Sequence, residues 1–222
     1  MLTFRRVFSS SIGTKWLIGL TGLGLFAYLI LHLIGNALIL AGPATFNEYA
    51  HRLISNPLIV PVEIGLLAIF LLHVYKAITN YLANRAARPV GYATKKHAGH
   101  TSRKSVASST MIWSGLTILF FVVVHVKQFK YGAWYGTVGN SSTRDLARTE
   151  FEVFSRPLWV TFYVVSTLIV GLHLRHGISS SFQSIGFDHP IYTRRLTTWG
   201  IVFAAIIGVG LACIPVWVYF TR

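Results

Sequence analysis

Four histidines lie in the middle of four different apolar stretches of the chain. They are His32 in LILHLIGN, His73 in IFLLHVYK, His125 in FVVVHVKQ and His173 in IVGLHLRHG. An ionisable side chain at membrane depth is costly, so one histidine in each of four stretches indicates a shared role. Imidazole is an axial ligand of haem iron, and two imidazoles fill both axial positions of one haem. The four histidines therefore predict two bis-histidine haem b groups suited to electron transfer.

The elements that carry these histidines are expected to be membrane-spanning helices. Of the 222 residues, 53% are hydrophobic and only 12% are charged. Five stretches reach the length of about 20 residues that crosses a hydrocarbon core. They cover residues 15–41, 57–83, 106–128, 157–182 and 196–220. The sequence thus predicts an all-α integral membrane protein, with five transmembrane helices forming one haem-binding bundle in a single domain, 1–222. The first stretch is too long for the apolar region of a signal peptide, so we expect it to remain as a span.

The basic residues indicate how the helices are oriented. The formal net charge is +14, and the positive residues gather before the first stretch and between the second and third. Cytoplasmic loops carry this excess of Lys and Arg, so we expect the N-terminus in the cytoplasm and, after five spans, the C-terminus outside the plasma (inner) membrane. No aromatic-interleaved groove accompanies these charges, which favours lipid or a soluble cytoplasmic subunit over nucleic acid as their partner.

The single cysteine limits the redox chemistry that the chain is able to perform. Cys213 alone supplies neither the thiolates of an iron–sulfur cluster nor the C-x-x-C-H of a c-type haem. The sequence also lacks a G-x-G-x-x-G motif and a P-loop. Redox chemistry here must therefore use haem or quinone, and other subunits must supply the remaining cofactors.

The depths of the histidines predict how they pair. With a rise of 1.5 Å per residue, His32 and His125 lie roughly 26–28 Å from the cytoplasmic ends of their helices. His73 and His173 lie only about 14–16 Å from that side. We therefore expect an outer haem between His32 and His125 and an inner haem between His73 and His173. His176, one turn beyond His173, is the alternative ligand, or else a propionate or quinone contact.

The order and spacing of these motifs resemble a known family. The segments LTGLGLFAYLILHLIGN, FNEYAHRLISNPLIVPVEIGLLAIFLLHVYKA and LHLRHGISSSFQSIG are similar to those of the five-helix, di-haem cytochrome b anchor of succinate dehydrogenase and fumarate reductase, the succinate:menaquinone type of complex II. The resemblance covers nearly the whole chain. It implies a membrane anchor for a flavoprotein and an iron–sulfur protein on the cytoplasmic side, and electron transfer through the inner haem and then the outer haem to menaquinone.

A quinone site near the outer haem needs a proton donor. The chain has only six acidic residues, and Glu63 and Glu48 lie at the expected outer level, so both are candidates for quinone protonation. A hydrogen-bonded structural role is the alternative for Glu63. Lys76 and Arg175 are candidates for contacts with haem propionates or quinone, although both side chains are also long enough to reach the inner headgroups.

Two other classes of protein fit parts of the same pattern. One is a di-haem cytochrome b subunit of another quinone-linked oxidoreductase, which would differ in helix number and ligand spacing. The other is a haem-free, proton-coupled transporter in which histidines and glutamate form a proton path. Inverted repeats and broken helices would support a transporter, and neither is evident in the sequence.

Overall fold

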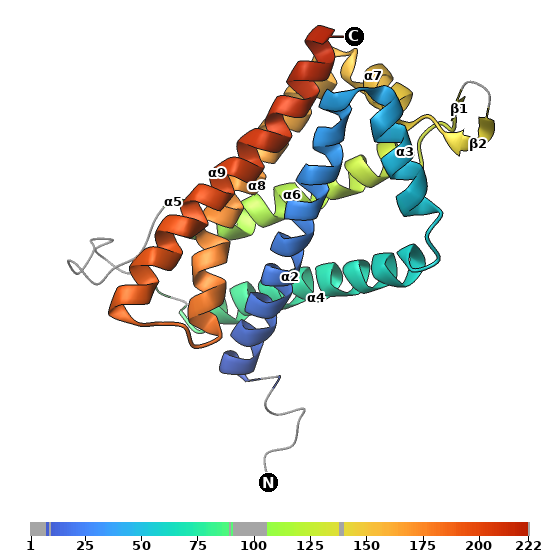
Figure 1. Ribbon diagram of the computed structural model, residues 1–222. Coiled ribbons are helices and arrows are strands. Elements are labelled where there is room, and N and C mark those ends of the chain that lie inside the picture. The colour runs from blue at the N-terminus through green and yellow to red at the C-terminus, as the bar shows by residue number, and fades with distance from the viewer. Residues whose placement is uncertain (1–7, 9, 89, 91–105, 138–139, 222) are drawn as a thin grey trace.

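The computed structural model describes residues 8, 10–88, 90, 106–137 and 140–221. Within these residues, five helices are long and apolar enough to cross a membrane, which confirms the predicted integral membrane bundle (Figure 1). They are α2 (Ser11–Ala37, continued by the 3₁₀ turn η1, Leu38–Ala41), α4 (Ile59–Ala86), α6 (Met111–Phe129), α8 (Pro157–Ser184) and α9 (Pro190–Thr221). The short helix α5 (Val106–Ser109) precedes α6. Several basic residues used to predict the orientation lie outside the described part: Arg5, Arg6, Lys95, Lys96, Arg103 and Lys104.

Local sequence signals set where the spanning helices begin. Ser10 caps α2, because its side chain accepts a hydrogen bond from the backbone N–H of Gly13. A proline stands at the start of α8 and of α9, where its fixed φ suits the first turn. The expected spans had placed the start of the last helix at residue 196, but Pro190 and the hydrogen bond from Thr193 to Asp188 begin it earlier.

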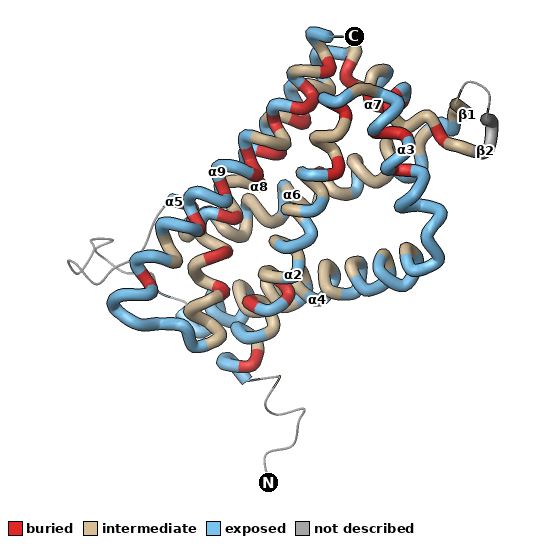
Figure 2. Tube along the Cα trace, in the orientation of Figure 1, coloured by how far each residue is buried: buried red, intermediate tan, exposed pale blue. Residues whose placement is uncertain are grey.

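The spanning helices pack unequally. α8 and α9 run side by side and contain most of the buried positions of the bundle (Figure 2). They meet at Gly171 and Gly208, where a Cβ added to Gly208 would lie 3.0 Å from the Cα of Gly171. By contrast, every residue of α4 is described and none is buried. Of the other histidine-bearing helices, α4 packs mainly against α2 and α6 mainly against α8, and both have fewer buried residues than the α8–α9 pair.

One end of the bundle, which we call the α7 end, is closed by the connections between spans. It comprises α3 (Pro43–Ile54), α7 (Leu146–Phe154) and an antiparallel pair of short strands, β1 (Gly136–Thr137) and β2 (Asn140–Arg144). Helix α7 occupies most of the segment 141–154. The strands were not expected, and they form the only sheet among the described residues. The C-terminal end of α9 lies at this end too (Figure 1).

Asn47 joins α3 to α7. Its side-chain amide donates to Asp145 Oδ1 at 2.7 Å, and its oxygen accepts from the backbone N–H of Ala147 at 2.9 Å. Asp145 is in turn the N-cap of α7, accepting from the backbone N–H of Arg148. Asn47 is only 7% exposed, so these hydrogen bonds are shielded from water.

We expect Asn47→Ala to lower the free energy of unfolding by roughly 1–3 kcal/mol, because the buried N–H of Ala147 and the cap Asp145 would each lose a partner. Thermal unfolding in detergent, followed by circular dichroism, measures this loss. Glu48→Ala is the matched control on the same helix, since Glu48 forms only an exposed ion pair with Arg52. An Asn47→Ala protein as stable as the control would contradict the proposed clamp.

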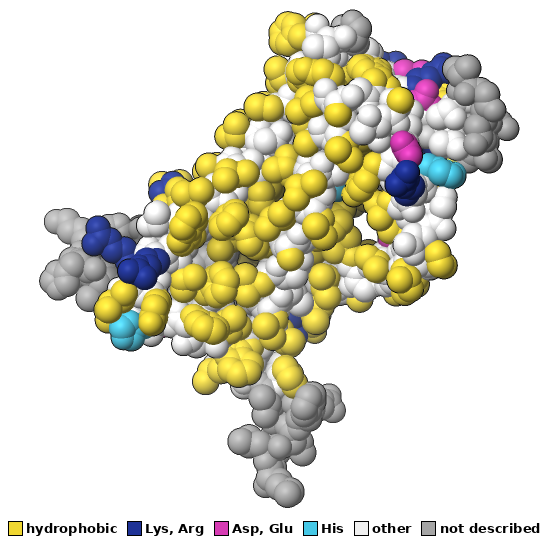
Figure 3. All heavy atoms as spheres, viewed as in Figure 1, with side chains coloured by type: hydrophobic (Ala, Val, Ile, Leu, Met, Phe, Trp, Pro, Cys, Tyr) yellow, Lys and Arg dark blue, Asp and Glu magenta, His cyan; other side chains and the backbone are white. Residues whose placement is uncertain are grey.

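The surface has the distribution of polarity that a lipid environment requires. Hydrophobic side chains cover the flanks of the spanning helices, while charged side chains gather toward the two ends of the bundle (Figure 3). Large apolar side chains on these flanks are strongly exposed, such as Leu31 at 67%, Ile64 at 63% and Phe120 at 62%. An apolar surface of this extent is stable in a lipid bilayer rather than in water.

Candidate functional site

His32 on α2 and His125 on α6 face each other near the α7 end. Their ring centroids are 5.7 Å apart and their ring planes are nearly perpendicular, at 82°. Two imidazoles that bind one metal ion from opposite sides have ring centres about 6 Å apart, since each metal–nitrogen bond is about 2.0 Å. The observed separation therefore fits two ligands on opposite sides of a single iron.

His73 on α4 lies in the other half of the bundle, where it contacts α2. Its Nδ1 is 3.0 Å from the hydroxyl of Thr21. The Thr21 hydroxyl already donates its proton to the carbonyl of Leu17, at 2.6 Å, so it is an acceptor toward His73. This arrangement places the proton of the ring on Nδ1 and leaves the lone pair of Nε2 for a metal.

His173 on α8 has an equivalent partner on α6. Its Nδ1 lies 2.9 Å from the hydroxyl of Ser114, and that hydroxyl donates to the carbonyl of Met111 at 3.1 Å. The same reasoning gives His173 a protonated Nδ1 and a free Nε2. His73 and His173 also interact electrostatically with each other, which places them in one neighbourhood.

The outer histidines differ in how their Nδ1 atoms are held. His32 Nδ1 lies 3.2 Å from the hydroxyl of Tyr28, one turn earlier on α2. His125 Nδ1 is buried and has no hydrogen-bond partner among the described residues. The ring of His125 is instead surrounded by aromatic side chains, namely those of Phe121, Phe129 and Tyr163.

Two glycines keep space beside the inner histidines. A Cβ on Gly22 would lie 3.3 Å from Cε1 of His73, and a Cβ on Gly115 would lie 3.5 Å from Cε1 of His173. A side chain at either position would crowd the imidazole or the region next to it. The free Nε2 atoms and the two neighbouring glycines fit haem at the inner pair, and the separation of the rings of His32 and His125 fits haem at the outer pair.

Glu63 lies at the α7 end of α4. Its carboxylate forms an ion pair with Lys130, at the end of α6, and both side chains are 44% exposed. Glu63 also interacts electrostatically with Tyr28, the hydroxyl partner of His32. The structure thus places Glu63 close to the hydroxyl partner of His32, with its side chain partly exposed.

The other candidate residues lie farther from the histidine pairs or on the surface. Glu48 forms an exposed ion pair with Arg52 on α3. Lys76 Nζ donates to the backbone carbonyl of Phe8 at 3.2 Å, so its charge is directed toward the N-terminal end of the bundle. Arg175 is exposed, and His176 is half-buried one turn from His173. His176 interacts electrostatically with His173, as His73 does.

The hydroxyl partners of the histidines were largely missed by sequence reasoning. Neither Thr21 nor Ser114 is among the site residues predicted above. Tyr28 does carry a sequence signal, because residues four apart on a helix lie on the same face. Thr21 and Ser114 carry none, since they reach their histidines across 52 and 59 residues of sequence.

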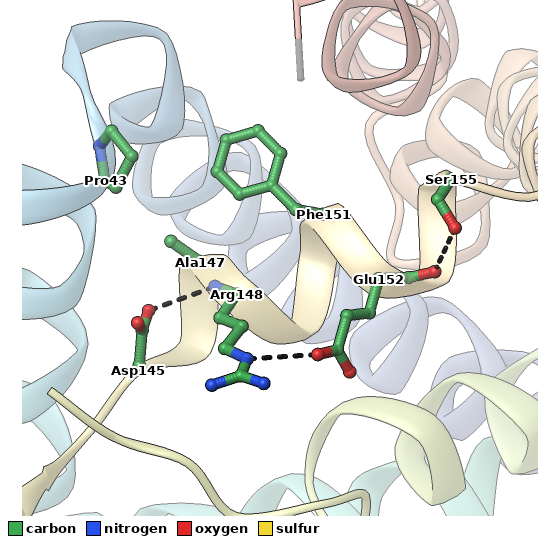
Figure 4. Close-up of a pocket in the computed structure, with 7 residues that line it drawn as sticks. All are labelled: Pro43, Asp145, Ala147, Arg148, Phe151, Glu152 and Ser155. Carbon is green, nitrogen blue, oxygen red and sulfur yellow. Dashed lines mark hydrogen bonds and ion pairs between the residues drawn. The ribbon is translucent and has the colours of Figure 1, made fainter.

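A shallow depression lies on the outer surface of α7. Pro43 of α3 forms one side, and α7 contributes the other residues, with Arg148 paired to Glu152 along its rim (Figure 4). The lining residues are Pro43, Asp145, Ala147, Arg148, Phe151, Glu152 and Ser155. The depression is open and polar at its rim, so it gives water access to α7 rather than an enclosed ligand site.

Comparison with known proteins gives a relative that matches nearly the whole chain. The chain is 28% identical over 214 residues to the succinate dehydrogenase cytochrome b558 subunit of Bacillus subtilis (strain 168), an alignment that covers 95% of this chain and 94% of that protein. No protein-family profile and no solved structure matches the chain. Over nearly its whole length, the chain is therefore similar to a cytochrome b subunit of succinate dehydrogenase.

Proposed function

We propose that this chain is the membrane-anchor cytochrome b subunit of a succinate:quinone oxidoreductase. The observation that carries the proposal is the placement of four histidines, two in each half of the bundle, in a chain similar end to end to a succinate dehydrogenase cytochrome b subunit. A haem b with two histidine ligands accepts and passes on one electron at a time, with no open position for substrate. His32 and His125 would hold the outer haem, and His73 and His173 the inner haem.

The residues around each pair prepare the imidazoles for this role. Thr21 and Ser114 fix the tautomer of His73 and His173, so that Nε2 of each ring is the metal-binding atom. The Tyr28 hydroxyl lies within hydrogen-bond distance of His32 Nδ1 and helps to orient that ring. Hydrogen bonds of this kind orient the ligand and raise its basicity, which strengthens binding of the metal and tunes its potential.

The partners follow from what the chain lacks. One cysteine and no nucleotide-binding motif leave flavin and iron–sulfur chemistry to a flavoprotein and an iron–sulfur subunit on the cytoplasmic side of the plasma membrane. In this assignment the inner pair receives electrons from the iron–sulfur subunit, and the outer pair passes them to menaquinone. Glu63, near Tyr28 and partly exposed, is the candidate proton donor to the quinone.

The experiment that tests the proposal is quantification of haem in the purified protein. A reduced-minus-oxidised absorption spectrum with pyridine haemochrome analysis should give two low-spin haems b per chain. The purified complex should also contain a flavoprotein and an iron–sulfur subunit and should reduce a menaquinone analogue with succinate. A chain that binds no haem would overturn the assignment.

We expect Ser114→Ala to weaken the inner haem selectively. Loss of the hydroxyl leaves Nδ1 of His173 without an acceptor, and loss of such a partner typically costs 10–100-fold in metal affinity. Transfer of haem to apomyoglobin, followed by absorption, measures the change as faster loss of the inner component. The matched control is Thr117→Ala on the same helix, because the Thr117 hydroxyl bonds only the backbone of Trp113 and is exposed. Equal rates of haem loss from the two variants would contradict the role of Ser114.

A further inference from the structure

Glu150 is a carboxylic acid buried within the apolar cluster at the α7 end. Glu150 is only 4% exposed, and its Oε2 atom is buried with no hydrogen-bond partner among the described residues. Ala147 and Phe154 lie about one turn before and after it, on the face of α7 that packs into the bundle. A polar group in such a place is costly unless it is neutral or has a function.

No basic side chain compensates the carboxyl group within the described part of the chain. Arg144 donates instead to the carbonyls of Lys130 and Ala133, and its guanidinium lies over the ring of Trp134. Arg148, two residues before Glu150 and on the outer side of α7, pairs with Glu152. Burial raises the pKa of Glu150 to about 8, so the group holds a proton at neutral pH and is able to release it.

Glu150 is connected to the outer histidine pair through one side chain. Tyr163 on α8 interacts electrostatically with Glu150 and packs its ring against that of His125, with centroids 5.9 Å apart. The Tyr163 hydroxyl donates to Oε1 of Gln128, one turn beyond His125 on α6, at 2.6 Å. A change of charge at His125 therefore changes the electrostatic potential at Glu150, because the cluster between them is apolar.

The elements packed against α7 present few other groups that titrate or carry charge. α8 presents Tyr163 and α6 presents Phe129, and both rings pack against Phe154 of α7. α3 presents Phe46 and the amide of Asn47, and α9 presents Ile214 and Val218. Asp145, at the N-cap, is engaged by Asn47 and by the backbone of Arg148. Glu150 is thus the acid whose proton equilibrium is best placed to respond to the outer site.

We propose that Glu150 is the proton-binding group of the outer redox site. The inference rests on the proposed function, since it requires an electron carrier between His32 and His125. In molecules in which Glu150 is ionised, the arrival of one electron there from the iron–sulfur subunit is accompanied by the binding of one proton from the outer aqueous side, and the carboxylate becomes a carboxylic acid. When that electron leaves to a quinone, the acid releases the proton. The net charge of the buried cluster is then the same in both states, which avoids the cost of an isolated charge in an apolar site.

The sign of the pH dependence follows from this coupling. An added electron makes the outer site more negative and raises the pKa of Glu150, so protons are taken up on reduction in the pH range around and above the oxidised-state pKa. Reduction coupled to proton uptake becomes less favourable as the proton concentration falls. The midpoint potential of the outer haem should therefore fall as pH rises from about 7 to 9, and level off well below that range, where Glu150 is protonated in both states.

The test is a redox titration of both haems against pH in the intact purified complex. Glu150→Gln keeps the shape of the side chain but removes the titration, and we expect it to reduce the pH dependence of the outer haem by at least half while both haems remain bound. Glu150→Asp, which keeps a carboxyl group, should restore part of it. Glu152→Gln is the matched control on the same helix, because hydrogen bonds from Tyr135 and Arg148 hold the pKa of Glu152 below its usual range and the group stays ionised. This control should behave as the wild type.

A second readout does not depend on a haem potential. The redox-induced infrared difference spectrum of the wild type should contain a carboxylic acid C=O band that Glu150→Gln removes and Glu152→Gln retains. An unchanged pH dependence and an unchanged band in Glu150→Gln, with two haems bound, would overturn the proton-binding role. If Glu150→Gln loses haem, the Glu150→Asp complex decides, since a proton-binding group predicts a shifted band and a structural acid predicts none. A wild type without two haems would instead overturn the proposed function, so the two failures are distinguishable.

Discussion

Replacing His32 with alanine should remove the outer haem and leave the inner haem in place. The same spectral component should disappear from His125→Ala, because both imidazoles are needed to fill the axial positions of one iron. His73→Ala and His173→Ala should remove the other component. Each variant is expected to retain about half of the haem measured per chain in the wild type. Pyridine haemochrome analysis with redox-difference spectra of the four purified variants measures this result.

The control for this series is His176→Ala, which lies one turn from His173 but should keep both haems. A protein in which His176→Ala loses the inner component and His173→Ala keeps it would reassign the ligand. If His32→Ala and His73→Ala removed the same component, the pairing itself would be wrong. The pairing has support from geometry, since the rings of His32 and His125 lie 5.7 Å apart while His73 contacts Thr21 in the other half of the bundle.

The sequence predicted the spanning helices and the candidate ligands because these depend on local pattern. A run of about 20 apolar residues is readable without knowledge of any other segment. The depth of a histidine also follows from its distance to the ends of its own helix. Even the hydroxyl of Tyr28 was accessible in principle, since it lies four residues before His32.

Features made by contacts between helices were not predicted. Thr21 and Ser114 are ordinary hydroxyl residues in their own segments, and only the crossing of α2 with α4 and of α6 with α8 brings them to the histidines. Glu150 is similar. The segment LARTEFEVF mixes charged and apolar residues, as a surface helix does. The burial of Glu150 is evident only once α7 packs against Tyr163 and α9. The two short strands before α7 depend in the same way on pairing across a turn.

Gly171→Leu should separate α8 from α9 and remove the inner haem. The two helices touch through backbone atoms here, because a Cβ on Gly171 would lie 3.1 Å from the carbonyl oxygen of Ala204 and 3.2 Å from the Cα of Gly208. Backbone atoms of two long helices are not able to give way as a flexible side chain does. Overpacking of this kind typically costs about 1–3 kcal/mol, and a branched side chain against backbone belongs at or above the upper end.

The consequence for function follows from the position of His173, two residues beyond Gly171. A displaced α8 moves His173 away from Ser114 and from the inner site, whereas His32 and His125 lie on α2 and α6 and should keep their haem. We therefore expect one haem per chain in Gly171→Leu and a Tm lower by roughly 4–12 °C, at about 2–4 °C per kcal/mol for a chain of this size. Haem analysis and thermal unfolding in detergent measure both effects.

A graded series separates a steric cause from a general loss of folding. Gly171→Ala adds only the Cβ and should cause a smaller loss of Tm with both haems bound. Leu172→Phe adds bulk at the next position, where the side chain is 54% exposed toward the surroundings, and should change neither quantity. If Gly171→Leu bound two haems with an unchanged Tm, the close contact of α8 and α9 would not be what fixes His173. Loss of the inner haem and a lower Tm in Gly171→Leu would show that the small residues where α8 meets α9 hold His173 in place without touching it.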